Sequence, residues 1–291
     1  MVRRLELGHP EHRQLLDHCR ARGILFLSTP FDNASADFLV NDLAMPQIKI
    51  PSGEVTNAPF LLYLARFSLP LILSTGMSTL GEVEDALGVL AFGMGGGDQT
   101  DTPGRAAFRR AYLSEHGQAL LRERVTLLHC TTEYPAPFAE VNLRAMDTLS
   151  VAFGIRVGFS DHTNGIAIPL AAAARGASIV EKHFTLDRNL PGPDHLASLE
   201  PVELSSMVKG IRQVECALGD GRKIPALSEV KNISIARRSL VAESAIAEGG
   251  IWSAETLSCK RPGTGRSPFD YWTLLGQGVR RAYVADELID D

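Results

Sequence analysis

The sequence predicts an α/β fold of the TIM-barrel type, in which parallel strands alternate with helices. Two observations predict this fold. Short apolar runs alternate along the chain with segments that have the hydrophobic period of a helix, which is typical of a parallel sheet. Each apolar run also ends in a cluster of polar side chains, and a (β/α) barrel gathers such clusters at the carboxyl ends of its strands.

Six apolar runs are expected to form the parallel strands. They lie at residues 24–28, 47–50, 69–74, 125–129, 155–160 and 177–181. Helix-period segments separate most of them, and the clearest cover about 10–22, 78–91 and 165–175. The six decorated strand ends favour a barrel over an open doubly wound sheet, which builds its site only near its switch point. A closed barrel of this type has eight strands, so two strands are expected to be missing.

Three changes in composition predict the domain organisation. Residues 1–217 are expected to form the barrel domain, with an insertion at about 93–124 that is Gly-rich at first and then amphipathic. Residues 218–232 contain Gly, Lys and Pro and are expected to be a linker. Residues 233–291 alternate short strand patterns with turns, which indicates a small β-rich domain.

The composition excludes several classes of protein. Hydrophobic residues make up 45% and charged residues 22%, as in ordinary globular proteins. The net charge of −5 and the absence of a basic block argue against nucleic-acid binding. No apolar run is long enough to span a membrane, and no secretory signal is evident. The widely spaced cysteines predict reduced thiols in a cytoplasmic protein: Cys19, Cys130, Cys216 and Cys259.

Two histidines follow neighbouring predicted strands. His162 and His183 lie 21 residues apart, which is one strand–helix step, so both imidazoles are expected at the same mouth of the barrel. With Asp161, Glu181 and Asp194 near them in the chain, they favour a site for a divalent transition metal. Two histidines leave open metal positions, where a substrate carbonyl can be polarised. The alternative is a pair of histidines that are only hydrogen-bonded at strand ends.

Lys49 ends a strand that is otherwise apolar, and Ser52 and Gly53 follow it. A lysine, hydroxyl groups and glycine amides together suit an anion such as a phosphate. Hydroxyl groups recur at the ends of other predicted strands: Ser28, Thr29, Ser74, Thr75 and Ser160. Each serine alone is equally well explained as a turn residue, so the prediction depends on their recurrence.

His129 and Cys130 are adjacent in one predicted strand. Successive side chains of a strand point to opposite faces of the sheet. This spacing excludes a catalytic pair of these two residues.

The strand-end clusters, in this order, resemble those of the N-acetylneuraminate (sialic acid) synthase family, which includes legionaminic and pseudaminic acid synthases. The resemblance rests on STPFD, KIPSGE, LSTGMST, LHCTTEYPAP, FSDHT, EKHFTLDRNLPGPDH and SLEP. The tail SLVAESAIAEGGIWSAETLSCKRPGTG is similar to the C-terminal antifreeze-like (SAF) domain of that family. The GPDH sequence and the long insertion are more similar to the sialic and legionaminic branch than to the pseudaminic one.

The resemblance implies a TIM-type barrel followed by a SAF domain. It also implies a transferase that condenses phosphoenolpyruvate with an N-acetylated hexosamine, either N-acetylmannosamine or a 2,4-diacetamido analogue. The product is a nine-carbon 2-keto sugar acid, and phosphate is released. Mn²⁺, or Mg²⁺ or Co²⁺, is the implied cofactor, and a domain-swapped homodimer is the implied assembly.

The same resemblance assigns roles to residues of this chain. His162 and His183 are implied to hold the metal, which polarises the open-chain sugar aldehyde. Glu181 joins them as a catalytic residue, and it binds sugar hydroxyls together with Asp194. Arg261 is implied to reach the N-acetyl end of the sugar bound by the other subunit. Six further residues are implied to hold phosphoenolpyruvate: Lys49, Ser52, Thr29, Thr132, Tyr134 and Ser160.

Relative to the family pattern, the chain is expected to lack the first two barrel strands, with an acid and a lysine that they carry. Residues 1–291 alone are therefore expected to turn over near background, and the missing segment to restore activity. The alternative is a non-catalytic protein that binds sugar or phosphoenolpyruvate, or that only dimerises through its SAF domain. A weaker alternative is another metal-dependent barrel lyase or aldolase, of the 3-deoxy-heptulosonate synthase kind, against which the SAF-like tail argues.

Overall fold

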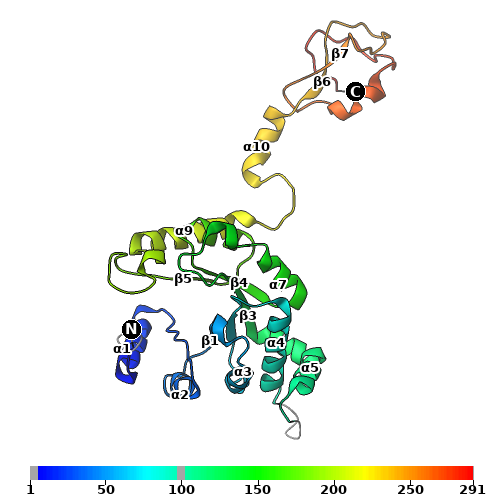
Figure 1. Ribbon diagram of the computed structural model, residues 1–291. Coiled ribbons are helices and arrows are strands. Elements are labelled where there is room, and N and C mark those ends of the chain that lie inside the picture. The colour runs from blue at the N-terminus through cyan, green and yellow to red at the C-terminus, as the bar shows by residue number, and fades with distance from the viewer. Residues whose placement is uncertain (1–5, 97–101, 291) are drawn as a thin grey trace. The chain divides into compact units, whose positions relative to one another are not determined.

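A parallel sheet of five strands, in the order β1-β2-β3-β4-β5, forms the centre of the first of two units (Figure 1). The computed structural model describes residues 6–96 and 102–290, and the units comprise residues 1–219 and 220–291. The strands are β1 Ile48–Ile50, β2 Leu71–Ser74, β3 Val125–Cys130, β4 Arg156–Asp161 and β5 Val180–Lys182.

The helices of this unit pack against one face of the sheet. They are α3 Ala58–Ala65, α4 Leu80–Met94, α6 Glu115–Arg124, α7 Ala145–Phe153 and α8 Ala167–Ala174, and α9 Pro201–Leu218 packs on α8. Alternate strand residues supply the apolar side chains of this core: Ile48, Ile50, Leu71, Leu73, Leu127, Val157 and Phe159. Because side chains alternate along a strand, Lys49, Ser160 and Glu181 lie on the opposite, concave face.

Three elements precede β1 in the chain. They are α1 His9–Arg22, α2 Asn33–Asp37 and the π-helix η2 Phe38–Asp42. A small apolar cluster of Phe38, Leu39, Leu43 and Met45 holds η2, and Leu16 and Phe26 pack against it. Short 3₁₀ turns follow three of the strands: η3 Ser52–Glu54, η4 Phe138–Glu140 and η5 His195–Ala197.

The predicted strand at residues 24–28 is wrong. This segment has no regular structure and no strand pairs with it among the described residues, and Ile24 and Leu25 are 64% and 59% exposed. An apolar run forms a strand only where a neighbouring strand accepts its backbone hydrogen bonds, and here none does. The last predicted strand also begins later than expected, at Val180 instead of Ala177. The parallel strands alternating with helices are confirmed, in five strands that form part of a barrel.

The segment predicted as an insertion, about 93–124, contains α5 Arg105–Leu113 and α6, while its first residues continue α4. Residues 97–101 of the insertion lie outside the described part of the chain. Gly88 of α4 allows close contact with the backbone of Phe108, because a Cβ there would lie 3.1 Å from the Phe108 carbonyl oxygen. The rings of Phe92 and Phe108 meet at 5.4 Å. The insertion therefore packs on the outer helices of the sheet.

The second unit has its own core of apolar side chains. Helix α10 Leu227–Ala236 lies partly in the stretch expected as a linker, and an antiparallel pair, β6 Ser239–Ala242 and β7 Leu257–Lys260, follows it. The turn η6 Pro268–Asp270 and helix α11 Tyr271–Leu274 complete the regular elements. Buried side chains hold this unit together: Leu240, Ala242, Trp252, Leu257, Leu274, Val279, Tyr283 and Ile289. In neither unit is any described helix both long and apolar enough to cross a membrane.

Candidate active site at the carboxyl ends of the strands

Lys49 and Glu181 show that the sheet curls. They lie on β1 and β5, the two outer strands of the sheet, yet Lys49 Nζ is 3.5 Å from Glu181 Oε2. Lys49 is only 6% exposed, whereas the Glu181 side chain is 41% exposed. A buried ammonium needs an anionic partner, and Glu181 supplies one at the rim of the concave face. The contact therefore brings polar groups of the two outer strands together on the concave face.

Ser160 extends this contact to β4. It pairs directly with Glu181 in the register of β4 and β5, and its hydroxyl donates to Glu181 Oε1 at 2.7 Å. The Ser160 Oγ also lies 3.4 Å from His162 Nε2. The side chains of Lys49, Glu181, Ser160 and His162 thus form one continuous chain of contacts, as the sequence predicted for strand ends of a barrel.

His162 is buried and is held by a hydrogen bond to the backbone. Because a carbonyl oxygen can only accept, the Nδ1–H of His162 donates to the Thr131 carbonyl oxygen at 2.6 Å, and Nε2 faces Ser160. Burial lowers the pKa of His162, and the neighbouring His183 acts in the same direction, against the opposing effect of the hydrogen bond to Thr131. A histidine whose second nitrogen donates to a backbone carbonyl has the arrangement usual for metal ligands.

His183 completes the pair. The rings of His162 and His183 lie 5.4 Å apart, and the Tyr134 ring lies 4.2 Å from the first and 5.3 Å from the second. Burial raises the pKa of Tyr134, and nearby Cys130, Asp194 and Glu181 raise it further, so the phenol keeps its proton. The sequence prediction that both imidazoles lie at one mouth agrees with this geometry.

A metal at this place would take two nitrogen ligands from the protein. Within residues 6–96 and 102–290 no three His, Cys, Asp or Glu side chains form a ligand cluster. The donor set of the histidine pair fits a divalent ion that keeps several open positions for substrate or water. It does not fit a closed structural zinc site, which needs four protein ligands.

A second group of polar atoms surrounds Gly76 in the loop after β2. The Gly76 N–H donates to Ser52 Oγ at 2.9 Å, and Ser52 Oγ lies 3.2 Å from Cys130 Sγ. A Cβ on Gly76 would lie 2.4 Å from Thr132 Oγ1. Ser52 and Thr132, two of the residues predicted to bind phosphoenolpyruvate, therefore lie close together around this glycine.

Ser74 adds an orphaned hydroxyl to this region. It is 3% exposed, and its Oγ is the one buried side-chain oxygen or nitrogen in the described part of the chain that has no hydrogen-bond partner. A buried hydroxyl without a partner carries a desolvation cost, which a ligand oxygen can offset. Ser74 ends β2 on the same face as Lys49, so it points into the concave side.

His129 and Cys130 lie on opposite faces, as predicted. His129 Nε2 is 2.7 Å from the Val141 carbonyl oxygen, whereas Cys130 contacts Ser52. The exclusion of a catalytic pair of these two residues is confirmed.

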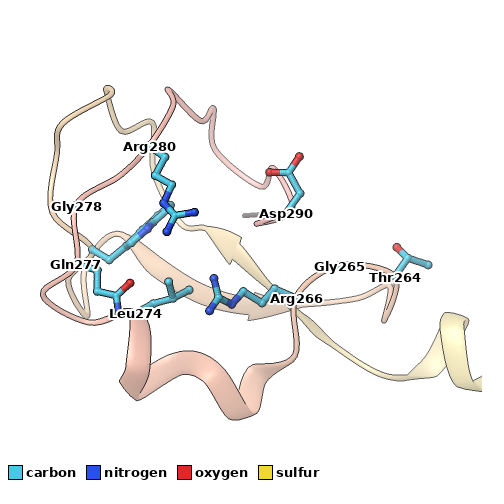
Figure 2. A pocket seen from close by; sticks show the side chains of 9 residues that line it. Thr264, Gly265, Arg266, Leu274, Gln277, Gly278, Arg280 and Asp290 are labelled. Atoms are coloured by element: carbon cyan, nitrogen blue, oxygen red, sulfur yellow. The ribbon is translucent and has the colours of Figure 1, made fainter.

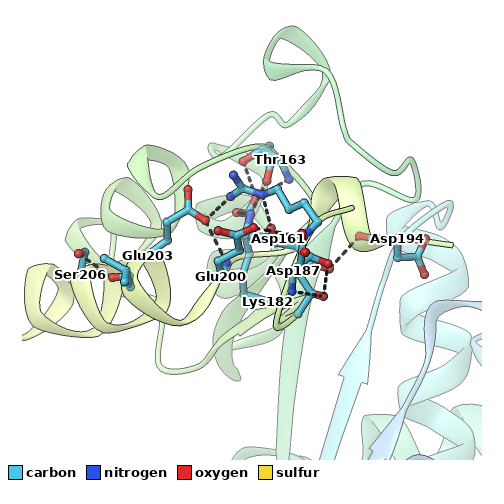
Figure 3. Close-up of polar contacts among 12 residues, drawn as sticks. Asp161, Thr163, Lys182, Asp187, Asp194, Glu200, Glu203 and Ser206 are labelled. Carbon is cyan, nitrogen blue, oxygen red and sulfur yellow. Dashed lines mark hydrogen bonds and ion pairs between the residues drawn. The ribbon is translucent and has the colours of Figure 1, made fainter. Parts of the chain in front are cut away.

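Asp161, expected beside the histidine pair, directs its side chain to a cation on the other face of the sheet, although its charge still acts on His162. Asp161 is fully buried and pairs with Lys182, whose Nζ lies 2.5 Å from Asp161 Oδ2 (Figure 3). Residue 161 has the same strand parity as Phe159, so its side chain lies on the helix-facing side, away from Ser160. Hydrogen bonding from Arg188 lowers the pKa of Glu203 on α9, and the charge of Lys182 contributes to this shift.

Asp194, Thr29 and Arg261 are placed differently from one another. Asp194 is exposed in the loop before η5, with a left-handed backbone (φ 66°), and it is close enough to Tyr134 to raise the pKa of the phenol. Thr29 is half-buried and forms no hydrogen bond with the predicted site residues among those described. Arg261 belongs to the second unit, where its Nε donates to the Ala236 carbonyl oxygen at 3.0 Å.

The second unit has a cavity of its own, of about 580 Å³ (Figure 2). Arg266, Arg280 and Gln277 line it together with Trp252 and Leu274. The Arg266 guanidinium pairs with Asp270 at 3.2 Å, so part of the positive charge is already compensated. None of the residues predicted from the sequence lines this cavity, and Arg261 is not part of its wall.

Sequence reasoning assigned no site role to Lys182, Gly76 or Cys130. The signal for Lys182 was present, because it follows the site residue Glu181 in the same strand, and successive side chains of a strand point to opposite faces. Gly76 and Cys130 carried no such signal. Their contacts with Ser52 join three strand-end loops that are far apart in the chain.

The fold and the site together define a class of protein: a domain of the (β/α)-barrel type with a buried lysine, several hydroxyl groups and a histidine pair at the carboxyl ends of its strands. The family model described as "NeuB family" matches residues 1–223. The chain belongs to the NeuB family.

The chain is similar to two named relatives and to one solved structure. The chain is 49% identical over 289 residues to N,N'-diacetyllegionaminic acid synthase of Campylobacter jejuni, with 99% of this chain and 79% of the relative covered. It is 31% identical over 290 residues to human N-acetylneuraminate-9-phosphate synthase, with 99% and 72% covered. The N-acetylneuraminic acid synthetase of Leptospira borgpetersenii superposes with a TM-score of 0.64 at 32% identity, covering 78% of this chain and 70% of that one.

Proposed function

We propose that the chain condenses phosphoenolpyruvate with an N-acetylated hexosamine and releases phosphate. Identity of 49% to a diacetyllegionaminic acid synthase, against 31% to a sialic acid phosphate synthase, favours a 2,4-diacetamido hexose over N-acetylmannosamine. The observation that supports the proposal is the contact chain from Lys49 through Glu181 and Ser160 to His162, whose ring lies 5.4 Å from that of His183.

The phosphate and carboxylate of phosphoenolpyruvate are assigned to the cationic side of the site. The buried Lys49 ammonium supplies charge, and the hydroxyl groups of Ser52 and Ser160 supply donors. The orphaned Ser74 hydroxyl, at the end of the neighbouring strand, supports a ligand there. Thr132 and Tyr134 complete the assignment from the loop after β3, and Thr29 is retained as a more distant member.

The sugar is assigned to the histidine side. His162 and His183 would hold Mn²⁺, or Mg²⁺ or Co²⁺, and the bound ion would supply polarisation of the sugar aldehyde. Glu181 and Asp194 accept hydrogen bonds from sugar hydroxyls. The C–C bond forms between C3 of phosphoenolpyruvate and the aldehyde carbon, water adds at C2, and cleavage of the C–O bond releases phosphate.

The C-terminal unit is proposed as a SAF domain, and Arg261 of the partner subunit would reach the N-acetyl end of the sugar in a domain-swapped homodimer. Arg261 is exposed and lies in the RPGTG sequence that resembles that domain. We assign the reaction to the cytoplasm, since the four cysteines are free in the structure.

Glu181→Gln tests the assignment. Loss of the carboxylate charge should weaken sugar binding in calorimetry and lower any phosphate release from the two substrates by about 10²–10⁴-fold, while the amide can still accept from Ser160. Glu215→Gln on the exposed face of α9 is the matched control and should change neither. Phosphate release without sugar would contradict the proposal. Binding of both ligands with no release would favour the alternative of a non-catalytic binding protein.

A further inference from the structure

A buried ion pair joins β4 to β5 on the face of the sheet opposite the proposed site. Lys182 Nζ lies 2.5 Å from Asp161 Oδ2, and the two side chains are 2% and 0% exposed. Asp161 Oδ1 accepts from the Thr163 N–H at 3.0 Å and from the Thr163 hydroxyl at 2.9 Å, and Lys182 Nζ donates to the Thr163 carbonyl oxygen. Both charged groups therefore have hydrogen-bond partners within one strand pair and the turn that follows it.

Each partner of this pair is flanked by residues of the proposed site. Asp161 lies between Ser160 and His162, and Lys182 lies between Glu181 and His183. The register places Asp161 directly opposite Lys182, and Ser160 directly opposite Glu181. The β4–β5 ladder has three residue pairs, and two further backbone hydrogen bonds precede it, from Ser178 N–H to the Val157 carbonyl oxygen and from Phe159 N–H to the Ile179 carbonyl oxygen.

The charged pair favours this register of β4 and β5 over a shifted one, whereas an apolar pair would not distinguish the two. A slip by one residue would turn every side chain of β5 to the other face, and it would leave two charges buried without partners. An apolar pair of similar volume would fill the space equally well, and replacing a buried ion pair in this way is often neutral or stabilising. Stability therefore does not explain why the position is charged.

We propose that Asp161 and Lys182 are positioning residues for the histidine pair. Asp161 fixes the turn at Thr163, and with it the His162 backbone, while Lys182 anchors β5 and with it His183. The inference rests on the proposed function, in which the two imidazoles bind a divalent ion. In this inference, the Asp161–Lys182 ion pair maintains the 5.4 Å separation between the rings of His162 and His183.

The double variant Asp161→Leu with Lys182→Met separates positioning from stability. We expect its free energy of unfolding in urea to equal or exceed that of the unmodified protein, because two apolar groups replace a desolvated pair. We expect its Mn²⁺ affinity, measured by calorimetry and by the electron paramagnetic resonance of the bound ion, to fall by about 10–100-fold, the usual effect of losing residues that orient metal ligands. Phosphoenolpyruvate binding should persist, since Lys49 and Ser52 lie on and after β1.

Two further variants are controls. Arg212→Met with Glu215→Leu removes an exposed ion pair on α9 with the same net charge change, and it should alter neither stability nor Mn²⁺ affinity. Asp161→Asn alone leaves the Lys182 ammonium buried without its anion, so it should lower stability strongly.

The outcomes distinguish this inference from the proposed function. If the unmodified protein does not bind Mn²⁺, the proposed metal site fails, and a crystal structure of the double variant then decides the inference. An unchanged β4–β5 register and an unchanged ring separation in that crystal structure would overturn it. If the unmodified protein binds Mn²⁺ and the double variant binds it equally well, the positioning role is excluded.

Discussion

Glu181, Lys182 and His183 are consecutive in the chain and reach three different environments. Glu181 contacts Lys49 and Ser160 on the concave face, Lys182 contacts Asp161 beneath the helices, and His183 lies beside His162. Successive side chains of a strand point to opposite faces, so Glu181 and Lys182 lie on different faces of β5. His183 follows the last residue of β5, so this alternation does not constrain its side chain. Three charged or titratable residues at the end of a strand are therefore stable because each has a separate partner.

The histidine pair leads to a prediction about a single residue, His183. His183→Ala should lower Mn²⁺ affinity by at least about 100-fold, since loss of a residue that merely orients a ligand already costs about 10–100-fold. His183 is half-buried, so its truncation should leave the fold intact. The measurement is calorimetric titration with Mn²⁺, and His116→Ala, an exposed histidine on α6, is the control. Unchanged Mn²⁺ affinity in His183→Ala would remove the basis for a metal site.

At the scale of elements, apolar runs predicted five of the strands and misassigned a sixth. The run at 24–28 is as apolar as the others, but the sequence does not say whether a neighbour pairs with it. The sequence likewise does not show which neighbours a side chain near a strand end will meet. Asp161 is adjacent to His162 in the chain, but its side chain faces the helices. Chain neighbours at the end of a strand need not share a site, whereas residues one strand–helix step apart, such as His162 and His183, do meet.

The loops after β1, β2 and β3 meet at Gly76, and their contact gives a second prediction. Gly76→Ala should destabilise the protein by about 1–3 kcal/mol, because the new methyl group would lie 2.4 Å from Thr132 Oγ1 and 2.9 Å from Ser52 Oγ. Displacement of Ser52 removes a hydrogen bond to a charged ligand, worth about 1.5–3 kcal/mol, so the phosphoenolpyruvate dissociation constant should rise about tenfold or more.

Gly81→Ala is the matched control for that change. Gly81 is the second residue of α4, and apart from its chain neighbours and the backbone of its own helix nothing lies within 4 Å of the position that its Cβ would take. Alanine there should raise stability by about 0.5–1 kcal/mol, because glycine weakens a helix by that amount. Urea unfolding and phosphoenolpyruvate titration check both variants. Equal binding by Gly76→Ala and Gly81→Ala would show that the loop cluster is not part of the anion site.

At the scale of the whole molecule, the residues named in the proposal belong to two separate units of the chain. Lys49, Glu181 and the histidine pair belong to residues 1–219, and Arg261 belongs to residues 220–291. Each unit has its own apolar core. Removal of the residues after about 232 should therefore abolish sugar binding and leave phosphoenolpyruvate binding intact, as separate titrations can show. Equal loss of both would indicate unfolding instead.

Mixing two defective variants tests whether Arg261 acts across a dimer. Glu181→Gln and Arg261→Ala should each lose sugar binding when titrated alone in the presence of Mn²⁺. If the C-terminal unit of one subunit completes the site of the other, dissociating and recombining equal amounts of the two yields mixed dimers in which one of the two sites has both residues intact. With half of the dimers mixed, about a quarter of the unmodified number of sugar sites per chain should return. If Arg261 serves its own subunit, every site in the mixture still lacks one of the two residues, and no binding returns. Recovery near zero in a mixture whose subunit exchange is verified would therefore assign Arg261 to its own chain, and a monomer in light scattering would exclude the swapped dimer directly.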